Sequence, residues 1–378
     1  MRAAAPRHLL GWVAALLIVA GLSGAEGPVR SAPTRPSPAG PQAPAAVTLK
    51  RDAAPAKPAA KTVAATAAPR SPKIEYTGLK EIAARLGMKA AWDAGARKAV
   101  LADKTRRLEL VADSREARIN GLRVFLGSPA VLRRGQLEVS RIDLDTCLIP
   151  LLKPSLIQRV PPRPRVIALD PGHGGVDQGT QNARLGLKEK EFTLDVSRRL
   201  KALLERKGYT VVLTRDADER LDLQSRAIIA NRANADVFVS IHFNALPNDQ
   251  RTRGTEIFTF APAHQRSTNA WSLGASDDTE HEAAPGNRYD AANAMLAHAL
   301  HRELLAGLQT FDRGKKIGHL GVLRGLNCPG VLVESGFLSN DEEAKKIATP
   351  AYRQDIAEAL AAGIADYAAL VATLQAKR

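Results

Sequence analysis

The sequence predicts an α/β protein in which a largely parallel sheet has helices on both faces, preceded by a small α+β domain. From residue 165 onward, short apolar runs alternate with longer segments of helical periodicity, a pattern that favours parallel strands joined by crossover helices. Between residues 73 and 152, short strand-like runs dominate, and Asn-Gly joins two of them, which is a hairpin signal. The length of 378 residues also suits two domains.

The first 25 residues have the order of a secretory signal peptide. Arg2 and Arg7 precede an apolar run over residues 9–22, and Ser23-Gly24-Ala25 supplies small residues for cleavage. This run is shorter than the ~20 residues that a membrane-spanning helix needs. We therefore expect a cleaved signal rather than an uncleaved membrane anchor, export to the periplasm or cell envelope, and no stable membrane span after cleavage.

Residues 26–72 are expected to form a disordered, basic linker rich in Ala and Pro. Residues 27–72 contain ten prolines, seven basic residues, one acidic residue and no aromatic residue. Such a segment cannot bury enough apolar surface to offset the entropy of ordering it. It carries a large share of the formal net charge of +15, which favours attraction to anionic envelope surfaces.

Composition argues against two classes of protein. No nucleic-acid-binding motif accompanies the positive charge, so no nucleic-acid partner is expected. Cys147 and Cys328 are the only cysteines in the sequence. Two cysteines are too few for a disulfide scaffold, and we expect both thiols to be unpaired.

Residues 73–152 are expected to form the small domain. Helical spacing over residues 79–86 ends at Gly87, and Asn120-Gly121 joins the runs 117–119 and 122–126. The segment resembles the copper amine oxidase N-terminal-like domain in the order of Tyr76, Leu79, Gly87, Trp92-Asp93, Asn120-Gly121, Pro129 and Val139. The resemblance implies a spacer or a wall-binding module. Residues 73–152 contain no His, which argues against a copper site there.

A second linker and a larger domain complete the chain. Four prolines in residues 153–164 predict the linker. The larger domain is expected over residues 165–378. Its expected strands cover residues 166–169, 210–213, 237–241, 257–260 and 331–333. Its expected helices cover residues 189–207, 221–233, 291–308 and 351–374.

Four side chains at or beyond predicted element ends form the candidate site. His173 follows the first strand in Asp-Pro-Gly-His-Gly-Gly, His242 comes directly after the expected strand 237–241, and Glu334 comes directly after the expected strand 331–333. Sites in such sheets form at the carboxyl ends of strands. Glu189 begins a helix, where an acid is also favoured by the helix dipole, and Glu191 fits that position equally well. A core histidine remains the alternative for His242. Two His and one carboxylate form a hydrolytic zinc arrangement, and a further carboxylate nearby can accept a proton from water.

The larger domain resembles the zinc-dependent N-acetylmuramoyl-L-alanine amidases of the type-3 amidase family. The resemblance covers residue 165 to about residue 369 and is carried in order by residues 170–175, 186–190, 240–245, 312–314 and 331–340. It implies a zinc amidase catalytic domain with one Zn²⁺ bound by His173, Glu189 and His242. Glu334 is then the catalytic residue. The implied reaction cleaves the amide between N-acetylmuramic acid and the L-alanine of the peptidoglycan stem peptide.

The sequence also supports expectations for Asn244, Arg226 and residues 261–289. Asn244 either binds substrate or holds the strand end of His242, and Arg226 is expected to join a fold-stabilising ion pair. Residues 261–289 depart from the family pattern. Regulated relatives carry a blocking helix here, whereas Pro285-Gly286 and weak periodicity favour a mobile substrate loop. Control by a protein activator stays open.

Two other functions compete with this interpretation. A peptidoglycan peptidase could use the same metal chemistry, but different motifs around its ligands would be expected. A catalytically inactive cell-wall-binding protein would be signalled by loss of His173, Glu189, His242 or Glu334, and the sequence retains all four.

Overall fold

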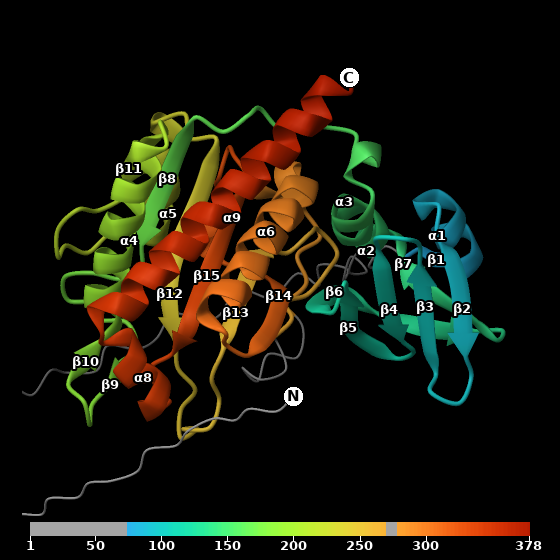
Figure 1. The fold of residues 1–378 in the computed structure, drawn as a ribbon, viewed down its shortest axis with the longest axis horizontal. Coiled ribbons are helices and arrows are strands. Elements are labelled where there is room, and N and C mark those ends of the chain that lie inside the picture. Colours follow the sequence, from blue (N-terminus) through green and yellow to red (C-terminus); the bar gives the residue numbers. More distant parts are fainter. Residues whose placement is uncertain (1–73, 270–277) are drawn as a thin grey trace, which may run out of the picture. The chain divides into compact units, whose positions relative to one another are not determined.

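A computed structural model describes residues 74–269 and 278–378 of the chain (Figure 1). The expected signal peptide, residues 1–25, and the expected linker, residues 26–72, lie outside the described residues. The described part contains the α/β domain and the small domain that the sequence predicts.

The small domain is built from short antiparallel strands and one well-formed helix. Helix α1, Leu79–Leu86, ends at Gly87, whose φ of 70° closes the helix as predicted. The hairpin turn is also confirmed: Asn120 and Gly121 both have positive φ, at 50° and 87°, as a two-residue hairpin requires. The strands are β1 Tyr76–Gly78, β2 Lys89–Asp93, β3 Lys98–Ala102, β4 Arg107–Val111, β5 Ser114–Ile119, β6 Leu122–Arg133 and β7 Gln136–Ser140.

Short helical segments lead from this domain toward the sheet of the α/β domain. They comprise α2 Arg141–Asp143, a π-helical turn Leu144–Leu148, α3 Ile149–Leu152 and a 3₁₀ turn Pro154–Leu156. The next residues, up to the start of β8, contain no helix or strand, in keeping with their prolines.

The α/β domain has the strand order β11-β8-β12-β15-β13-β14. The first four strands are parallel, β13 is antiparallel to β15, and β14 is parallel to β13. A largely parallel sheet is therefore confirmed, with two strands reversed at one side. The strands are β8 Val166–Pro171, β11 Thr210–Leu213, β12 Val237–Asn244, β13 Thr255–Phe260, β14 Asp312–Gly318 and β15 Gly330–Phe337. Strand β14 also pairs with β6 through Lys315 and Val124.

Helices cover both faces of this sheet, as predicted. One core joins Val237, Val239 and Ile241 of β12 to α4 Glu189–Arg206, α6 Asp290–Leu308 and α9 Pro350–Ala376. Figure 1 shows α6 and α9 lying side by side along the sheet. The alternate residue Phe238 joins a second core with α5 Leu223–Arg232 and α7 Gly321–Arg324, because successive side chains of a strand point to opposite faces.

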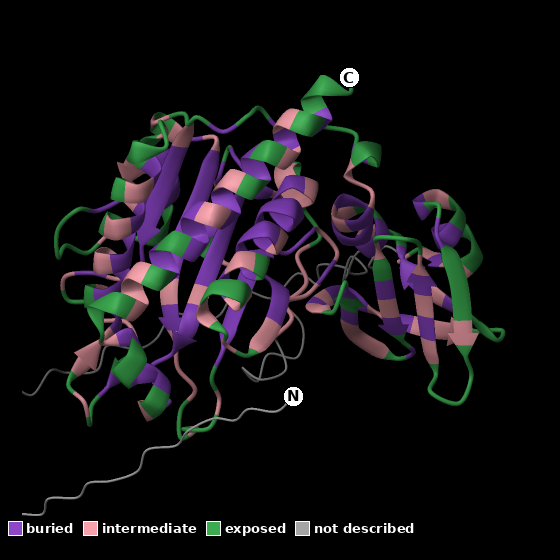
Figure 2. Cartoon of the chain, viewed as in Figure 1, coloured by how far each residue is buried: buried purple, intermediate pink, exposed green. Residues whose placement is uncertain are grey.

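Helix α9 is the one described helix that is long and apolar enough to cross a membrane. In its most apolar window, 56% is buried inside the protein, and the helix packs on α4 and α6. Figure 2 shows buried positions along the strands and exposed positions on the outer side of α9. A core helix of a folded domain explains this composition.

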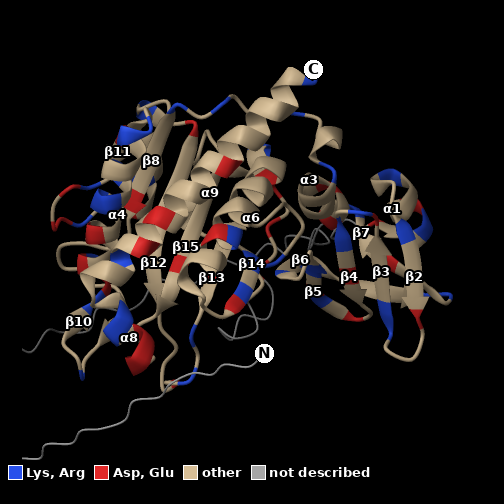
Figure 3. Ribbon diagram, viewed as in Figure 1, with Lys and Arg blue, Asp and Glu red and all other residues tan. Residues whose placement is uncertain are grey.

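Two local details refine the predictions. Helix α5 begins at Leu223, because the side chain of Asp222 accepts a hydrogen bond from Ser225 N at 2.8 Å and caps the helix. Cys147 and Cys328 are free and buried, so the prediction of unpaired thiols is confirmed. Figure 3 shows acidic and basic segments interspersed over the elements of the α/β domain.

The remaining elements lie in the connections. They are β9 Gln181–Asn182, β10 Leu187–Lys188, a 3₁₀ turn Pro285–Tyr289 and α8 Asp341–Ile347. Residues 261–269 and 278–284 contain no helix, and residues 270–277 of that segment lie outside the described part. Whether this segment is a mobile substrate loop stays a prediction.

Candidate metal centre and active site

Three predicted ligands converge beside the carboxyl ends of β8 and β12. One ligand atom from each of His173, Glu189 and His242 lies within 4.8 Å of the others. Glu189 contacts both histidines: its Oε2 is 3.1 Å from His173 Nε2, and its Oε1 is 2.9 Å from His242 Nδ1. Glu191 is exposed. The convergence therefore selects Glu189 over Glu191 as the first-turn acid at the centre.

The three ligands occupy space that is open only because two nearby residues are glycines and have no side chain. A Cβ on Gly172 would lie 2.3 Å from Cε1 of His242, and a Cβ on Gly179 would lie 2.5 Å from Oε2 of Glu189. Real Cβ atoms do not approach other atoms so closely. His173 itself has a φ of 59°, which is uncommon for a residue with a side chain. The glycine-rich turn after β8 is thus shaped around the imidazoles.

A buried ion pair fixes the start of this turn. Asp170 is fully buried at the end of β8 and accepts hydrogen bonds from Arg226 Nη1 at 2.8 Å and from the hydroxyls of Thr214 and Ser240. Arg226 also donates to the carbonyl oxygen of His173 at 2.9 Å. The predicted ion-pair role of Arg226 is what the structure shows, and the same guanidinium positions the backbone of a candidate ligand.

Arg215 secures the turn from the other side. Its side chain is 1% exposed and donates to the carbonyl oxygens of Pro171, at 3.0 Å, and Gly172, at 2.8 Å. The hydroxyl of Thr193 also donates to the carbonyl of Gly172 at 2.8 Å. The backbone that carries His173 therefore has little freedom to move.

The environment of Glu189 favours its charged form. Burial alone would raise the pKa of this carboxyl, but hydrogen bonds with His173 and His242 outweigh burial and hold the pKa below its usual value. The N–H groups of Thr180 and Phe243 donate to the two carboxylate oxygens at 2.7 and 3.0 Å. A carboxylate with such donors stays ionised when buried.

The donor set fits a zinc ion. Two imidazoles and one carboxylate are a common protein ligand set for catalytic zinc, with a further position left for water or substrate. His173 Nδ1 lies 3.0 Å from Asp177 Oδ1. A carboxylate on the far nitrogen of an imidazole fixes the tautomer and orientation that a ligating histidine needs.

Glu334 lies on β15, directly opposite His242 of the neighbouring strand β12. Glu334 of β15 pairs with His242 on one side and with Glu256 of β13 on the other. Directly paired residues project from the same face of a sheet, so the three side chains form a row. Burial, followed by the charges of Glu189 and Glu256, raises the pKa of Glu334 well above its ordinary value.

Both polar atoms of the Asn244 side chain are engaged inside the protein. Its Nδ2 donates to Glu256 Oε1 at 2.9 Å, and its Oδ1 accepts a hydrogen bond from Ala245 N at 2.8 Å. This is the arrangement expected if Asn244 holds the strand end after His242. Whether Asn244 also binds substrate stays a prediction.

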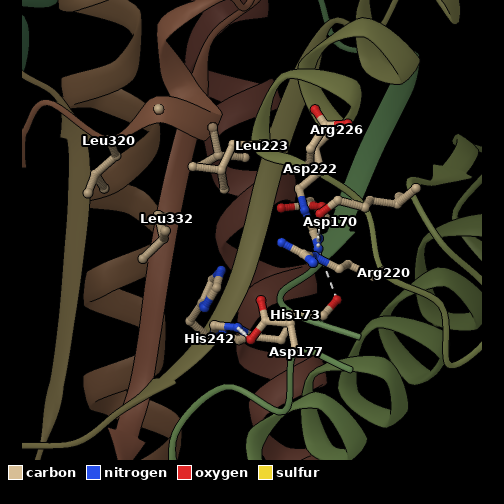
Figure 4. Close-up of a pocket in the computed structure, with 13 residues that line it drawn as sticks. Asp170, His173, Asp177, Arg220, Asp222, Leu223, Arg226, His242, Leu320 and Leu332 are labelled. Carbon is tan, nitrogen blue, oxygen red and sulfur yellow. Dashed lines mark hydrogen bonds and ion pairs between the residues drawn. The ribbon is translucent and has the colours of Figure 1, made fainter. Parts of the chain in front are cut away.

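A pocket of about 340 Å³ opens beside the candidate metal centre. Figure 4 shows His173, His242 and Asp177 together at one end of the pocket, while Leu223, Leu320 and Leu332 lie on the side away from Arg220. Leu223 is 57% exposed. The pocket therefore offers an apolar wall next to ionisable groups, as substrate sites commonly do.

Sequence reasoning missed Asp177, Arg215, Glu256 and Lys316. Asp177 lies four residues after His173, a spacing that could have suggested a partner. Glu256 stands inside an apolar strand, just as Glu334 does, so the cost of burying a carboxylate was an available signal for both. Nothing in the local sequence distinguishes Arg215 or Lys316 from surface cations.

The topology and the convergent donors define the class of the molecule as an α/β protein with a candidate mononuclear metal centre at the carboxyl ends of its strands. The family model described as N-acetylmuramoyl-L-alanine amidase matches residues 167–366. Because this is more than half of the sequence, the chain belongs to that family. A second model, described as copper amine oxidase N-terminal domain, matches residues 73–141.

Two curated relatives agree with the family match. An uncharacterized cell wall amidase of Bacillus anthracis is 36% identical over 210 residues, which cover 54% of this chain and 35% of the relative. The N-acetylmuramoyl-L-alanine amidase AmiC of Escherichia coli is 33% identical, over 61% of this chain and 64% of the relative. The chain thus spans less than two thirds of the length of either relative. The solved structure of AmiC2 of Nostoc punctiforme is 32% identical with a TM-score of 0.43, covering 53% of this chain and 96% of that chain.

Proposed function

We propose that this protein is a peptidoglycan hydrolase that cleaves the amide bond between N-acetylmuramic acid and the L-alanine of the stem peptide. The observation that supports this most is the row formed by His242 and Glu334 on neighbouring strands, with His173 and Glu189 converging on His242. In such a row, a metal ligand and a proton acceptor lie next to each other on one face of the sheet. The family to which the chain belongs has amidases as its named members.

In this proposal, His173, Glu189 and His242 hold one Zn²⁺. A bound zinc ion supplies Lewis acidity, which lowers the pKa of a water molecule and polarises the amide carbonyl. Asp177 orients the ring of His173 through Nδ1. The backbone donors to Glu189 keep its carboxylate in place and charged. The ligand set is therefore rigid before any substrate arrives.

Glu334 is the proposed general base and acid. It accepts the proton of the attacking water and then passes it to the nitrogen of the leaving L-alanine. A carboxylate with a raised pKa suits both steps, because it takes up a proton more readily than an ordinary carboxylate does. The positive charge of a zinc ion would bring that pKa part of the way back toward its usual value.

The remaining parts of the proposal concern the whole chain. Residues 1–25 direct export to the periplasm or cell envelope, residues 26–72 tether the protein, and residues 73–152 act as a spacer or bind the wall. Residues 153–164 link this domain to the catalytic domain, residues 165–378. The partner is peptidoglycan, and a protein activator is left as an open part of the proposal.

A zymogram on purified peptidoglycan, followed by mass analysis of the products, tests the proposed reaction. We expect intact stem peptides that begin with a free L-alanine amino group, together with glycan strands that have lost their peptides. Shortened stem peptides would show a peptidase instead. Binding to peptidoglycan without any product would support the alternative of a catalytically inactive wall-binding protein.

A further inference from the structure

Glu334 has one buried carboxylate oxygen without a partner, and a buried ammonium group projects from the same face of the sheet two strands away. Oε2 of Glu334 is buried and makes no hydrogen bond to the described residues. Lys316 of β14 is 6% exposed. It pairs with Phe258 of β13, which in turn pairs with Leu332 of β15. Lys316 therefore projects from the same face as Glu334, one row along the strands.

The ammonium group of Lys316 is held by Glu256 instead. Its Nζ lies 2.6 Å from Glu256 Oε2. The rings of Phe258 and Phe125 lie 5.6 and 5.8 Å from the same nitrogen, so apolar groups occupy much of its surroundings. A buried cation of this kind needs a nearby anion, because the cost of removing it from water is large.

The position of Glu256 is itself electrostatically unfavourable. It is 1% exposed and stands directly opposite Glu334 in the register, and like charges directly opposite each other in a sheet are destabilising. Three groups offset this cost: Lys316, Arg313 through Nε at 3.0 Å, and Asn244 through Nδ2 at 2.9 Å. Both oxygens of Glu256 are thus fully engaged, while Oε2 of Glu334 is left without a partner.

We propose that Glu256 is a positioning residue that holds Lys316 away from Glu334, so that the side-chain oxygens of Glu334 stay free of a cation. Without the charge of Glu256, the next carboxylate along the row for the buried ammonium is Glu334. An ion pair formed there would occupy a carboxylate oxygen that the proposed reaction uses and would draw the side chain toward β14. This inference rests on the proposed function, in which Glu334 is the base.

Charge removal at Glu256 provides the test. Glu256→Gln keeps the size of the side chain and an oxygen acceptor for Asn244 but removes the charge. We expect kcat on soluble muropeptides to fall at least ~10-fold, but by no more than the ~10²–10⁴-fold that a general base contributes. KM and zinc content should stay close to those of the unaltered protein, because neither the pocket nor the three ligands change.

The double variant Glu256→Gln with Lys316→Met is the decisive comparison. It removes the ammonium together with its partner, so Glu334 is again without a competing cation, and kcat should recover most of the loss. Glu256→Asp, which retains the charge, should be less impaired than Glu256→Gln. As a matched control, Glu205→Gln removes the acid of the Lys201–Glu205 ion pair on the outer part of α4 and should leave kcat unchanged.

A crystal structure of Glu256→Gln gives a readout that does not depend on activity. We expect Nζ of Lys316 to have moved from residue 256 to Glu334. Thermal unfolding of each variant checks folding, and if Glu256→Gln does not fold, the double variant and Glu256→Asp still carry the comparison. Full activity in Glu256→Gln, or a double variant as impaired as the single one, would overturn the inference. An inactive unaltered protein would contradict the proposed function instead, while the position of Lys316 in the crystal would still decide the role of Glu256.

Discussion

Replacement of Gly172 by alanine should dismantle the candidate metal centre without unfolding the domain. The added Cβ would lie 2.3, 2.5 and 2.6 Å from Cε1, Nε2 and Nδ1 of His242. Ordinary carbon contacts begin near ~3.5 Å, so the ring must move by roughly 1 Å. The backbone cannot yield instead, because Gly172 N donates to Ile241 O and its carbonyl accepts from Thr193 and Arg215. Gly172 does not have a positive φ, so alanine adds no backbone strain of the left-handed kind.

The size of the effect follows from the tolerance of a zinc site. Zinc–nitrogen distances are about 2.0–2.1 Å and vary by about 0.2 Å, so a displacement of roughly 1 Å removes His242 as a ligand. Loss of a partner that merely orients a ligand costs ~10–100-fold in metal affinity. Loss of the ligand itself should cost at least that much, or about 1.4–2.8 kcal/mol.

Zinc affinity is measured by competition with a chromophoric chelator, and folding by circular dichroism during heating. Gly325→Ala is the matched control, because its Cβ would meet Ala227 at an ordinary 3.7 Å and its φ is −93°. We expect the control to bind zinc normally and Gly172→Ala to lose affinity while remaining folded. Normal zinc affinity in Gly172→Ala would refute the assignment of His242 as a ligand in the geometry described.

Two further substitutions test the roles of the carboxylates, and a third tests a titration. Glu334→Gln should lower turnover by ~10²–10⁴-fold with zinc content retained, whereas Glu189→Gln should release zinc; the reverse pattern by metal analysis would exchange the two roles. Burial raises the pKa of Asp290 to about 7, against the smaller opposing effects of Asn287 and Lys315. Since the unfolded value is about 3.9, the folded state holds the extra proton, and stability should fall as the pH rises from about 4 to about 7. In Asp290→Asn the melting temperature should lose this part of its pH dependence, and an unchanged slope would show that Asp290 titrates normally.

The sequence by itself determined the order of the helices and strands. It also indicated the strand ends near which the candidate site residues lie. Apolar runs bounded by Gly and Pro specify strands, and helical periodicity specifies the crossovers between them. That alternation favours parallel strands, so His173, His242 and Glu334 were expected near one edge of the sheet. The reversal of β13 and β14 was not contained in that pattern. The hairpin at Asn120-Gly121 follows from a local requirement for positive φ at both positions.

Only the tertiary structure decided which side chains are neighbours at that edge. Periodicity assigns a residue to a face, but the strand order places β13 beside β15 and so sets Glu256 against Glu334. The choice of Glu189 over Glu191 depends on how α4 packs against the turn after β8, which no local pattern contains. The Lys316–Glu256 pair joins residues 60 apart in the sequence. Its formation depends on strand register and on the exclusion of water, and both arise only when the sheet is assembled.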